Sequence, residues 1–246
     1  MFKYQIFVQG LTASKDAEIR DRIVTKLEQD SKLTQQAVAE ECQRIINLRQ
    51  DDTCTKTKVK FHVKENAVPV FKPKRAVPFA VNEEFDRCEK LGVIEKIDYS
   101  ESASPTVYVK KKKIRACADF SIGLNECLMT YSYSLLSLEE IFAKLNGGKS
   151  FSKLDLLEAY LQLQVKEECL KLLTINTHKG LYKFSRLPFG IKVAPSIFQQ
   201  VMDTILADTD FAIAYLDDIL IKSEFRDQHD KHVKKVFERL KAYKKE

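Results

Sequence analysis

The sequence predicts an α+β fold, because strand and helix signals are mixed along the chain without the strict alternation of a doubly wound sheet. Short apolar runs at 211–216 and 219–221 are typical of buried strands. A capping-box pattern at Ser137–Glu140 is typical of a helix start. The 246 residues are 44% hydrophobic and 31% charged, as expected for one large globular domain or two small ones.

The first 55 residues predict a small helical segment of their own, with helix signals over 14–27 and 34–46. This segment carries 8 basic and 9 acidic residues, whereas 56–246 carry 33 and 26. The net charge of +6 therefore comes from the larger part, which weakly favours a polyanionic partner. The polar stretch 51–60 is expected to be a linker between the two domains.

The middle of the chain predicts an extended strap, two helices and a pair of strands. Prolines spaced through 68–80 exclude a regular helix there. Asn82 can cap a helix that Gly92 ends. Residues 105–120 predict two strands joined by a basic tip, and the helix with the capping box is expected to end at the glycine pair 147–148.

The last hundred residues predict a strand that leads into a turn or short helix over 151–165. Pro195 can occupy the first turn of a helix that runs to about Leu206. A hairpin around Asp217 follows, and after it a final amphipathic helix. The apolar face of that helix is formed by Val233, Val236, Phe237, Leu240 and Tyr243.

Cysteine spacing and hydropathy exclude several classes of protein. Six cysteines occur without any CxxC pair, which argues against a zinc knuckle or a disulfide framework and favours free thiols in a reducing compartment. No apolar run reaches the length of a membrane span, and the N-terminus lacks a secretory signal. We therefore expect no membrane partner and a cytoplasmic location.

Two adjacent carboxylates, Asp217 and Asp218, interrupt the apolar run AYLDDILI. Burying adjacent like charges is costly, so the pair lies either in a polar turn or in a site where positive charge holds it. At the tip of a hairpin the two side chains can converge, although neighbours on a regular strand point apart. Two-residue hairpins prefer glycine, which is missing here, so the doublet alone leaves both interpretations open.

A third carboxylate, Asp155, ends a short strand in the sequence SKLDLLEAY. Alone, it is better explained as a strand-end cap. With Asp217 and Asp218 on a neighbouring strand end, it would form an oxygen site for Mg²⁺, with Mn²⁺ as an alternative. Two such ions, about 3.5–4 Å apart, can activate an attacking hydroxyl and stabilise a leaving pyrophosphate.

Four motifs, in this order, resemble those of reverse transcriptases, and the likeness is greatest to the Pol polyproteins of Ty3/Gypsy-type LTR retrotransposons. They are CADFSIGLN (117–125), SKLDLLEAY (152–160), RLPFGIKVAPSIFQ (186–199) and YLDD (215–218). The resemblance covers about 57–246. It implies the fingers and palm of a right-hand polymerase, with a central antiparallel sheet packed on helices.

The resemblance implies a nucleotidyl transfer to a primer 3′-OH, directed by an RNA template. Asp155, Asp217 and Asp218 would be the catalytic residues and metal ligands. Tyr160 would be the gate that leaves no room for a ribose 2′-OH, although without the motif it would be read as a core tyrosine. The implied partners are the RNA template, a DNA or RNA primer and dNTPs, bound mainly through phosphates.

The resemblance also implies further nucleotide-binding residues. Arg115 would contact the triphosphate, with Lys111 as a helper, because a guanidinium suits phosphate oxygens. The alternative for the lysine run is a solvated charged turn. Phe189 and Gly190 of LPFG would lie against the nucleotide and template, Gly190 allowing close backbone approach. The other members of this set are Leu156, Glu158 and Ala159.

The chain departs from the family pattern in two places. Residues 1–55 resemble the end of a Gag capsid region, but no Cys/His knuckle or aspartic protease motif lies between this segment and the polymerase motifs. The sequence also ends in the helix after YLDD, so we expect truncation before the thumb and feeble or absent processive synthesis.

Three functions follow as hypotheses. The first is an RNA-directed DNA polymerase domain, in the cytoplasm within a retrotransposon particle or in the nucleus. The second is an inactive remnant that binds nucleic acid through its basic fingers. The third is an assembly module that self-associates through 1–55.

Overall fold

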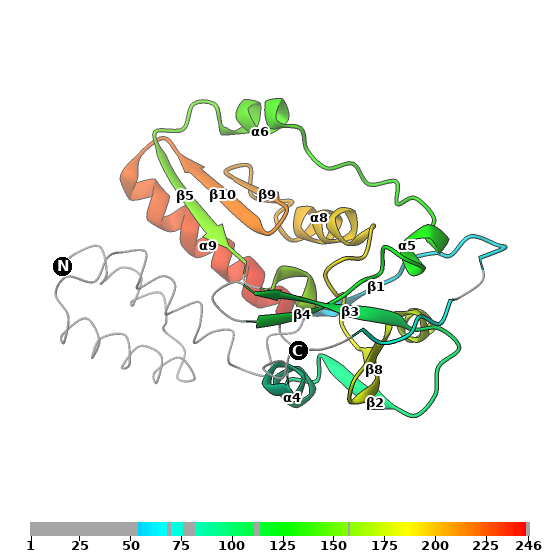
Figure 1. Ribbon diagram of the computed structural model, residues 1–246. Helices are drawn as coiled ribbons and strands as arrows, with labels where there is room; N and C mark the ends of the chain where they lie inside the picture. Colours follow the sequence, from blue (N-terminus) through cyan, green and yellow to red (C-terminus); the bar gives the residue numbers. More distant parts are fainter. Residues whose placement is uncertain (1–53, 68–69, 76–81, 111–113, 157, 245–246) are drawn as a thin grey trace, which may run out of the picture.

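The computed structural model describes residues 54–67, 70–75, 82–110, 114–156 and 158–244. These residues form three sheets, and the two larger ones lie at opposite ends of the described part of the molecule (Figure 1). A three-stranded sheet with two long helices lies at one end, and a five-stranded sheet with a shorter helix lies at the other. This mixture of helices and sheets agrees with the predicted α+β class.

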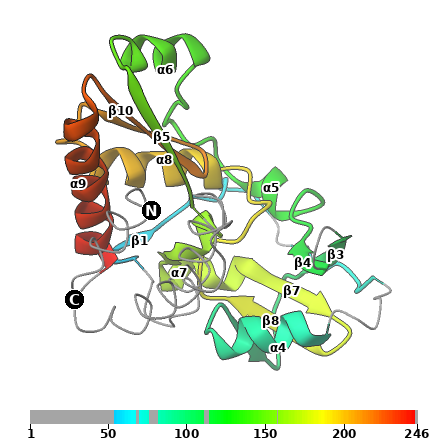
Figure 2. The ribbon, with the colours of Figure 1, turned by 90° about the vertical axis from the view of Figure 1, so that its left-hand side faces the viewer.

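The smaller sheet is antiparallel, in the order β5-β10-β9. Its strands are β5 (Ser150–Asp155), β10 (Asp218–Ser223) and β9 (Ala212–Tyr215). Helices α8 (Ala194–Ile205) and α9 (Arg226–Lys244) pack against it, as both views show (Figure 2). The predicted hairpin and both predicted helices are therefore confirmed.

The apolar core lies between this sheet and its helices. Ile219 and Ile221 of β10 and Val236 of α9 are each 0% exposed. Because residues alternate between the two faces of a strand, burial of Ile219 and Ile221 turns Asp218 and its same-face neighbours to the opposite side. The burial of alternate β10 residues in the core thus decides which face of the sheet carries Asp218.

The larger sheet has the order β2-β8-β7-β3-β4 and is mixed, because β3 and β7 run parallel while the other pairs are antiparallel. The predicted pair of strands over 105–120 is confirmed as β3 and β4. Helix α4 (Asn82–Lys90) packs beside β2 and β4. The strands are β2 (Ile94–Ile97), β3 (Ser104–Lys110), β4 (Ile114–Ala118), β7 (Thr174–Thr177) and β8 (Gly180–Phe184).

A third sheet of two strands and several short helices complete the fold. β1 (Cys54–Val59) pairs in parallel with β6 (Leu163–Val165), so the prediction of a linker over 51–60 is wrong for 54–59. Thr55, Thr57 and Val59 occupy alternate positions and suit a strand, although polar lysines stand between them. The remaining elements are α5 (Leu124–Cys127), α6 (Leu138–Leu145), η3 (Ala159–Gln162), α7 (Glu167–Leu170) and η4 (Lys171–Leu173).

Several predicted helix ends are found in the structure. Ser137 and Glu140 form the capping box of α6, with Ser137 Oγ accepting from Glu140 N at 3.2 Å and Glu140 Oε2 accepting from Ser137 N at 2.7 Å. Gly92, with φ of 61°, follows α4 as expected for a residue beyond a helix end. The helices predicted within 1–46 lie outside the described residues. No described helix is long and apolar enough to cross a bilayer.

Helix α9 is fixed to the sheet by a small polar cluster as well as by its apolar face. Ser152 Oγ lies 2.7 Å from His229 Nε2, and Ser223 Oγ lies 2.8 Å from His229 Nδ1. His232 Nδ1 also lies 2.8 Å from Ser223 Oγ, and its ring stacks on Phe211 with centroids 3.7 Å apart. Burial lowers the pKa of His229, Asp230 raises it, and His232 lowers it further.

We expect stability to fall as the pH drops below about 6.5, the ordinary histidine pKa. The pKa of His229 is lower in the folded protein, so between the two values the unfolded chain binds more protons and acid favours unfolding. Urea unfolding at pH 7.5 and pH 5.5 measures this loss. His229→Asn should make the difference smaller, and an unchanged difference would exclude His229 as a source of it.

Candidate active site

The register of β5 and β10 sets two carboxylates side by side. Asp155, the last residue of β5, is directly opposite Asp218, the first residue of β10. Directly opposed residues of antiparallel strands have Cβ atoms about 4.5–5.5 Å apart on the same face of the sheet. The pair lies where both strands meet the hairpin tip, so the prediction that these residues share one end of the sheet is confirmed.

The third carboxylate, Asp217, lies in the two-residue turn between β9 and β10. Tyr215 and Asp218 are paired across it, and Leu216 has φ of 54°. A positive φ in a leucine costs about 1–3 kcal/mol, and such strain concentrates at functional sites. Asp217 is exposed, and its carbonyl accepts a hydrogen bond of 2.8 Å from Leu156 N, which ties the turn to the end of β5.

Lys153 lies against these carboxylates. Its Nζ is 2.7 Å from Asp218 Oδ2. The hydrogen bond and charge of Asp218, and more weakly the charges of Asp155 and Asp217, raise the pKa of Lys153. A cation therefore already pairs with one of the three carboxylates, at the end of the sheet that carries the other two.

The donor atoms suit a divalent cation. All three side chains are carboxylates, the oxygen ligands that Mg²⁺ and Mn²⁺ take. Among the described residues, however, no three His, Cys, Asp or Glu side chains form a group ready to hold a metal ion. The three carboxylates thus fit the metal in chemistry and position on the sheet, while their side chains do not yet converge on one point.

Tyr160 follows β5 in η3, and two phenylalanine rings hold it. Its ring centroid lies 4.8 Å from that of Phe189 and 5.3 Å from that of Phe198, the latter edge to face. Burial, and then the charge of Asp217, raise the pKa of Tyr160. The expected gate residue is thus half-buried, packed against two aromatic rings and close enough to Asp217 for that charge to affect its pKa.

Gly190 brings two of the motifs into contact. Its φ is 91°, and a Cβ at this position would lie 3.1 Å from the carbonyl oxygen of Ala118. Asn125 Nδ2 donates to the Gly190 carbonyl at 2.8 Å, and Asn125 Oδ1 accepts from Lys192 N at 2.8 Å. The glycine predicted from the sequence is therefore required by the approach of 117–125, whatever else it contacts.

The other predicted nucleotide-binding residues belong to separate segments of the chain, and one of them lies outside the described residues. Ala159 is fully buried and Leu156 is half-buried after β5. Arg115 lies on β4 opposite Val109 of β3, and Lys111 lies outside the described residues. Their roles stay predictions.

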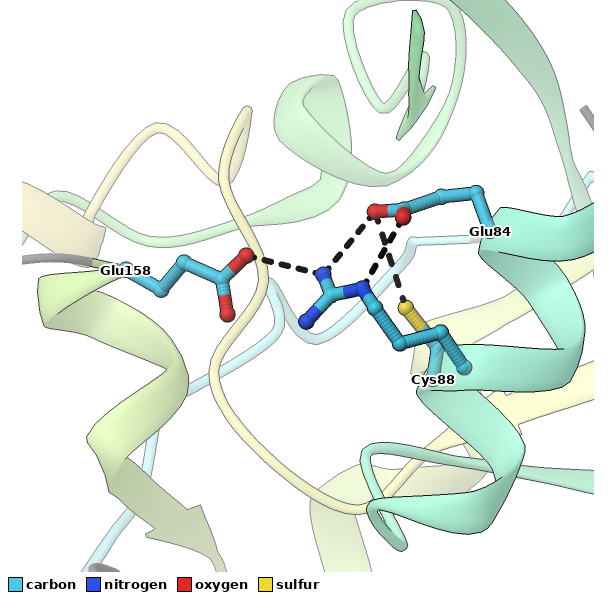
Figure 3. A network of polar contacts seen from close by, with 4 residues as sticks. Glu84, Cys88 and Glu158 are labelled. Carbon is cyan, nitrogen blue, oxygen red and sulfur yellow. Dashed lines mark hydrogen bonds and ion pairs between the residues drawn. The ribbon is translucent and has the colours of Figure 1, made fainter. Parts of the chain in front are cut away.

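Glu158 is engaged by a residue that sequence reasoning missed. Arg87 of α4 donates from Nη2 to Glu158 Oε1 at 2.9 Å, and donates to both carboxylate oxygens of Glu84, each at 2.9 Å (Figure 3). Glu158 has φ of 50°, a strained backbone conformation for a residue other than glycine. The ion pair with Arg87 therefore fixes a strained residue two positions before Tyr160. The hydrogen bonding that Arg87 donates to Glu84 is the largest factor that raises the pKa of Arg87.

The thiol of Cys88 completes this network, with Sγ 4.0 Å from Glu84 Oε1. Burial, and then the charge of Glu84, raise the pKa of Cys88 to about 12. The thiol therefore stays neutral at physiological pH, as predicted for a free structural cysteine.

We expect Arg87→Met to lower the free energy of unfolding by about 1–2 kcal/mol, because a bidentate pair and a second ion pair are lost from a partly exposed position. A double-mutant cycle with Glu158→Gln should give a coupling of about 1 kcal/mol. The exposed Arg226 provides the matched control, since Arg226→Met should change stability by less than about 0.5 kcal/mol. Additive effects of Arg87 and Glu158 would contradict the ion pair.

Known proteins resemble this chain in sequence. Residues 103–246 match the family model described as reverse transcriptase (RNA-dependent DNA polymerase). The uncharacterized protein K02A2.6 of Caenorhabditis elegans is 44% identical over 198 residues, which is 77% of this chain and 16% of that protein. The transposon Tf2-3 polyprotein of Schizosaccharomyces pombe is 34% identical over 166 residues, 66% of this chain and 12% of the polyprotein. The chain thus spans a small part of the length of these relatives.

A solved structure shares the fold. The crystal structure of the prototype foamy virus protease-reverse transcriptase aligns with a TM-score of 0.68 and 18% sequence identity. The alignment covers 96% of this chain and 30% of that one. At this identity the likeness concerns the fold alone, and it confirms the predicted α+β arrangement of fingers and palm.

Proposed function

This chain belongs to the reverse transcriptase family, as the polymerase part of a retrotransposon Pol protein, and from this premise we propose that it transfers deoxynucleotides to a primer 3′-OH on an RNA template. The observation that carries the proposal is the pairing of Asp155 with Asp218 across β5 and β10, with Asp217 at the adjoining hairpin tip. Three carboxylates at one open sheet end suit phosphoryl transfer, which needs positioning and charge neutralisation.

Asp155, Asp217 and Asp218 would hold Mg²⁺ or Mn²⁺. When bound, the metal supplies the positive charge that phosphoryl transfer requires at the triphosphate and the attacking hydroxyl. Carboxylates at the end of a sheet, backed by a buried core, give this charge a fixed position. The face opposite α8 and α9 is left for the nucleic acid.

Tyr160 would select the sugar. Its ring is held by Phe189 and Phe198, so it cannot turn away from a larger substrate without disturbing its neighbours. Arg115 and Lys111 would contact the triphosphate from the basic hairpin, and their positive charge suits that ligand. Glu158 would act less directly, by fixing the turn that carries Tyr160.

Single-nucleotide extension of a DNA primer on an RNA template tests the proposal. We expect addition of only the complementary dNTP, dependent on Mg²⁺ or Mn²⁺. An otherwise identical DNA template measures the preference for RNA. No addition by folded protein with either metal would overturn the proposal, and salt-dependent RNA binding would then favour the nucleic-acid-binding alternative.

Assembly and location remain further parts of the proposal. Self-association would involve 1–55, the segment that resembles Gag, and the particle would lie in the cytoplasm or the nucleus. Sedimentation of the full chain beside a chain starting at residue 54 would test the first point. Equal sedimentation behaviour of both chains would contradict it.

A further inference from the structure

Lys153 has a position on β5 that aims it at the carboxylates. Residues two apart on a strand share a face, so Lys153 lies on the same face as Asp155. It is paired with Leu220, whose neighbour two residues back on β10 is Asp218. Long side chains reach such diagonal cross-strand neighbours. The strand register therefore directs the ammonium toward the two opposed aspartates.

The charges around Lys153 make its contact different from an ordinary surface ion pair. An isolated exposed pair contributes little to stability. Here three aspartates gather at one sheet end, and close like charges repel one another. The Nζ of Lys153 lies 2.7 Å from Asp218 Oδ2, Asp155 is paired with Asp218 across the two strands, and Asp217 adjoins Asp218 in the turn. The ammonium thus offsets a repulsion shared by three side chains.

The same side chain can leave the site at little cost. Lys153 is 61% exposed, whereas Asp218 is only 24% exposed. The lysine ammonium is a compact, strongly hydrated charge on a flexible stem, so it can return to water when a competing cation arrives. A divalent ion carries twice its charge and binds several oxygens at once.

We propose that Lys153 is the resident cation of the aspartate site, which a divalent metal ion must displace, so that Lys153 weakens and thereby sets the metal affinity. This inference rests on the proposed function, because it takes the three aspartates to be metal ligands. In the metal-free protein, the ammonium pairs with Asp218 and adds positive charge beside the other two aspartates. Lys153 is a positioning residue in this scheme and needs no contact with substrate.

The test measures the binding of Mn²⁺ to the full chain in the absence of nucleotide and nucleic acid. Electron paramagnetic resonance detects the free ion and so gives the dissociation constant. The metal ion must displace the ammonium from Asp218, so removing that competing charge should tighten binding about ten-fold. We therefore expect Lys153→Met to lower the Mn²⁺ dissociation constant by that factor. Lys153→Arg keeps the charge and should bind close to the wild-type level. Lys234→Met, on the exposed side of α9, makes the same change in net charge away from the site.

A second measurement follows stability in the absence of metal. With chelator present, Lys153→Met should unfold at a lower urea concentration than wild type. Addition of Mn²⁺ should raise the urea midpoint of Lys153→Met by more than it raises the midpoint of Lys234→Met. This readout detects a folded but weakened variant and separates it from one that fails to fold.

The outcomes distinguish the inference from the proposed function. Wild-type binding that Asp217→Asn abolishes, together with unchanged or weaker binding by Lys153→Met, overturns the role of Lys153 and leaves the metal site intact. An equal gain in Lys234→Met also overturns it, because overall charge then explains the effect. No specific Mn²⁺ binding by any of these proteins overturns both.

Discussion

Asp217→Asn is expected to lower nucleotide incorporation by about 10³-fold, equivalent to about 4 kcal/mol of transition-state stabilisation. Asparagine keeps the size of the side chain and removes the negative charge that would hold a metal ion. The change does not disturb the turn, because Asp217 is exposed and its backbone carbonyl, not its side chain, accepts from Leu156 N. Single-nucleotide primer extension at saturating dNTP measures the effect.

The control for this prediction is Asp210→Asn, an exposed aspartate before β9 that is remote from the other carboxylates in the strand pairing. It should retain full incorporation. Both variants should unfold within about 0.5 kcal/mol of wild type, as exposed substitutions usually do. If Asp217→Asn kept most of its activity, Asp217 would not be a metal ligand, and Asp155 and Asp218 would have to hold the metal alone.

The aspartate doublet shows how far local sequence rules reach. Its position between two apolar runs correctly predicted a hairpin. The lack of glycine argued against a two-residue turn, yet the structure has one, with Leu216 in a left-handed conformation. The apolar strands on both sides, including the fully buried Ile219 and Ile221, outweigh the strain of about 1–3 kcal/mol. Turn propensity alone could not decide this case.

Contacts that depend on strand register or on distant pairing could not be predicted from the sequence. Lys153 lies two residues before Asp155, so their shared face was foreseeable, but the diagonal contact with Asp218 depends on the pairing of β5 with β10. Arg87 and Glu158 are 71 residues apart, and no sequence motif predicts that they contact each other. The parallel pairing of β3 with β7 could not be predicted either, because these strands are also far apart in the sequence.

The motif residues were predicted well where local geometry requires them. Gly190 needs both a positive φ and space for the Ala118 carbonyl, so a glycine in LPFG carries structural information by itself. Tyr160 is different, because its two possible explanations, core residue and gate, are both compatible with its half-buried ring. The rings of Phe189 and Phe198 support either one. Only a substrate comparison can separate them.

Tyr160→Ala is expected to reduce the preference for a dNTP over the matching NTP by about 100-fold, close to 2.7 kcal/mol. Loss of the ring would open space for the ribose 2′-OH, because the methyl group of alanine is too small to exclude that hydroxyl. The measurement is kcat/KM for each nucleotide opposite the same template base. Tyr160→Phe is the matched control, because it keeps the ring and removes only the hydroxyl, and it should retain the wild-type preference.

The ratio of the two kcat/KM values is also independent of how much of the variant is folded. Tyr160 packs against two aromatic rings, so its truncation should destabilise the fold by about 2–4 kcal/mol and reduce the active fraction of any preparation. Both nucleotides are tested on the same preparation, so that fraction cancels in the ratio. Equal loss of activity toward both nucleotides would identify Tyr160 as a core residue. A selective gain for the ribonucleotide would identify it as the gate.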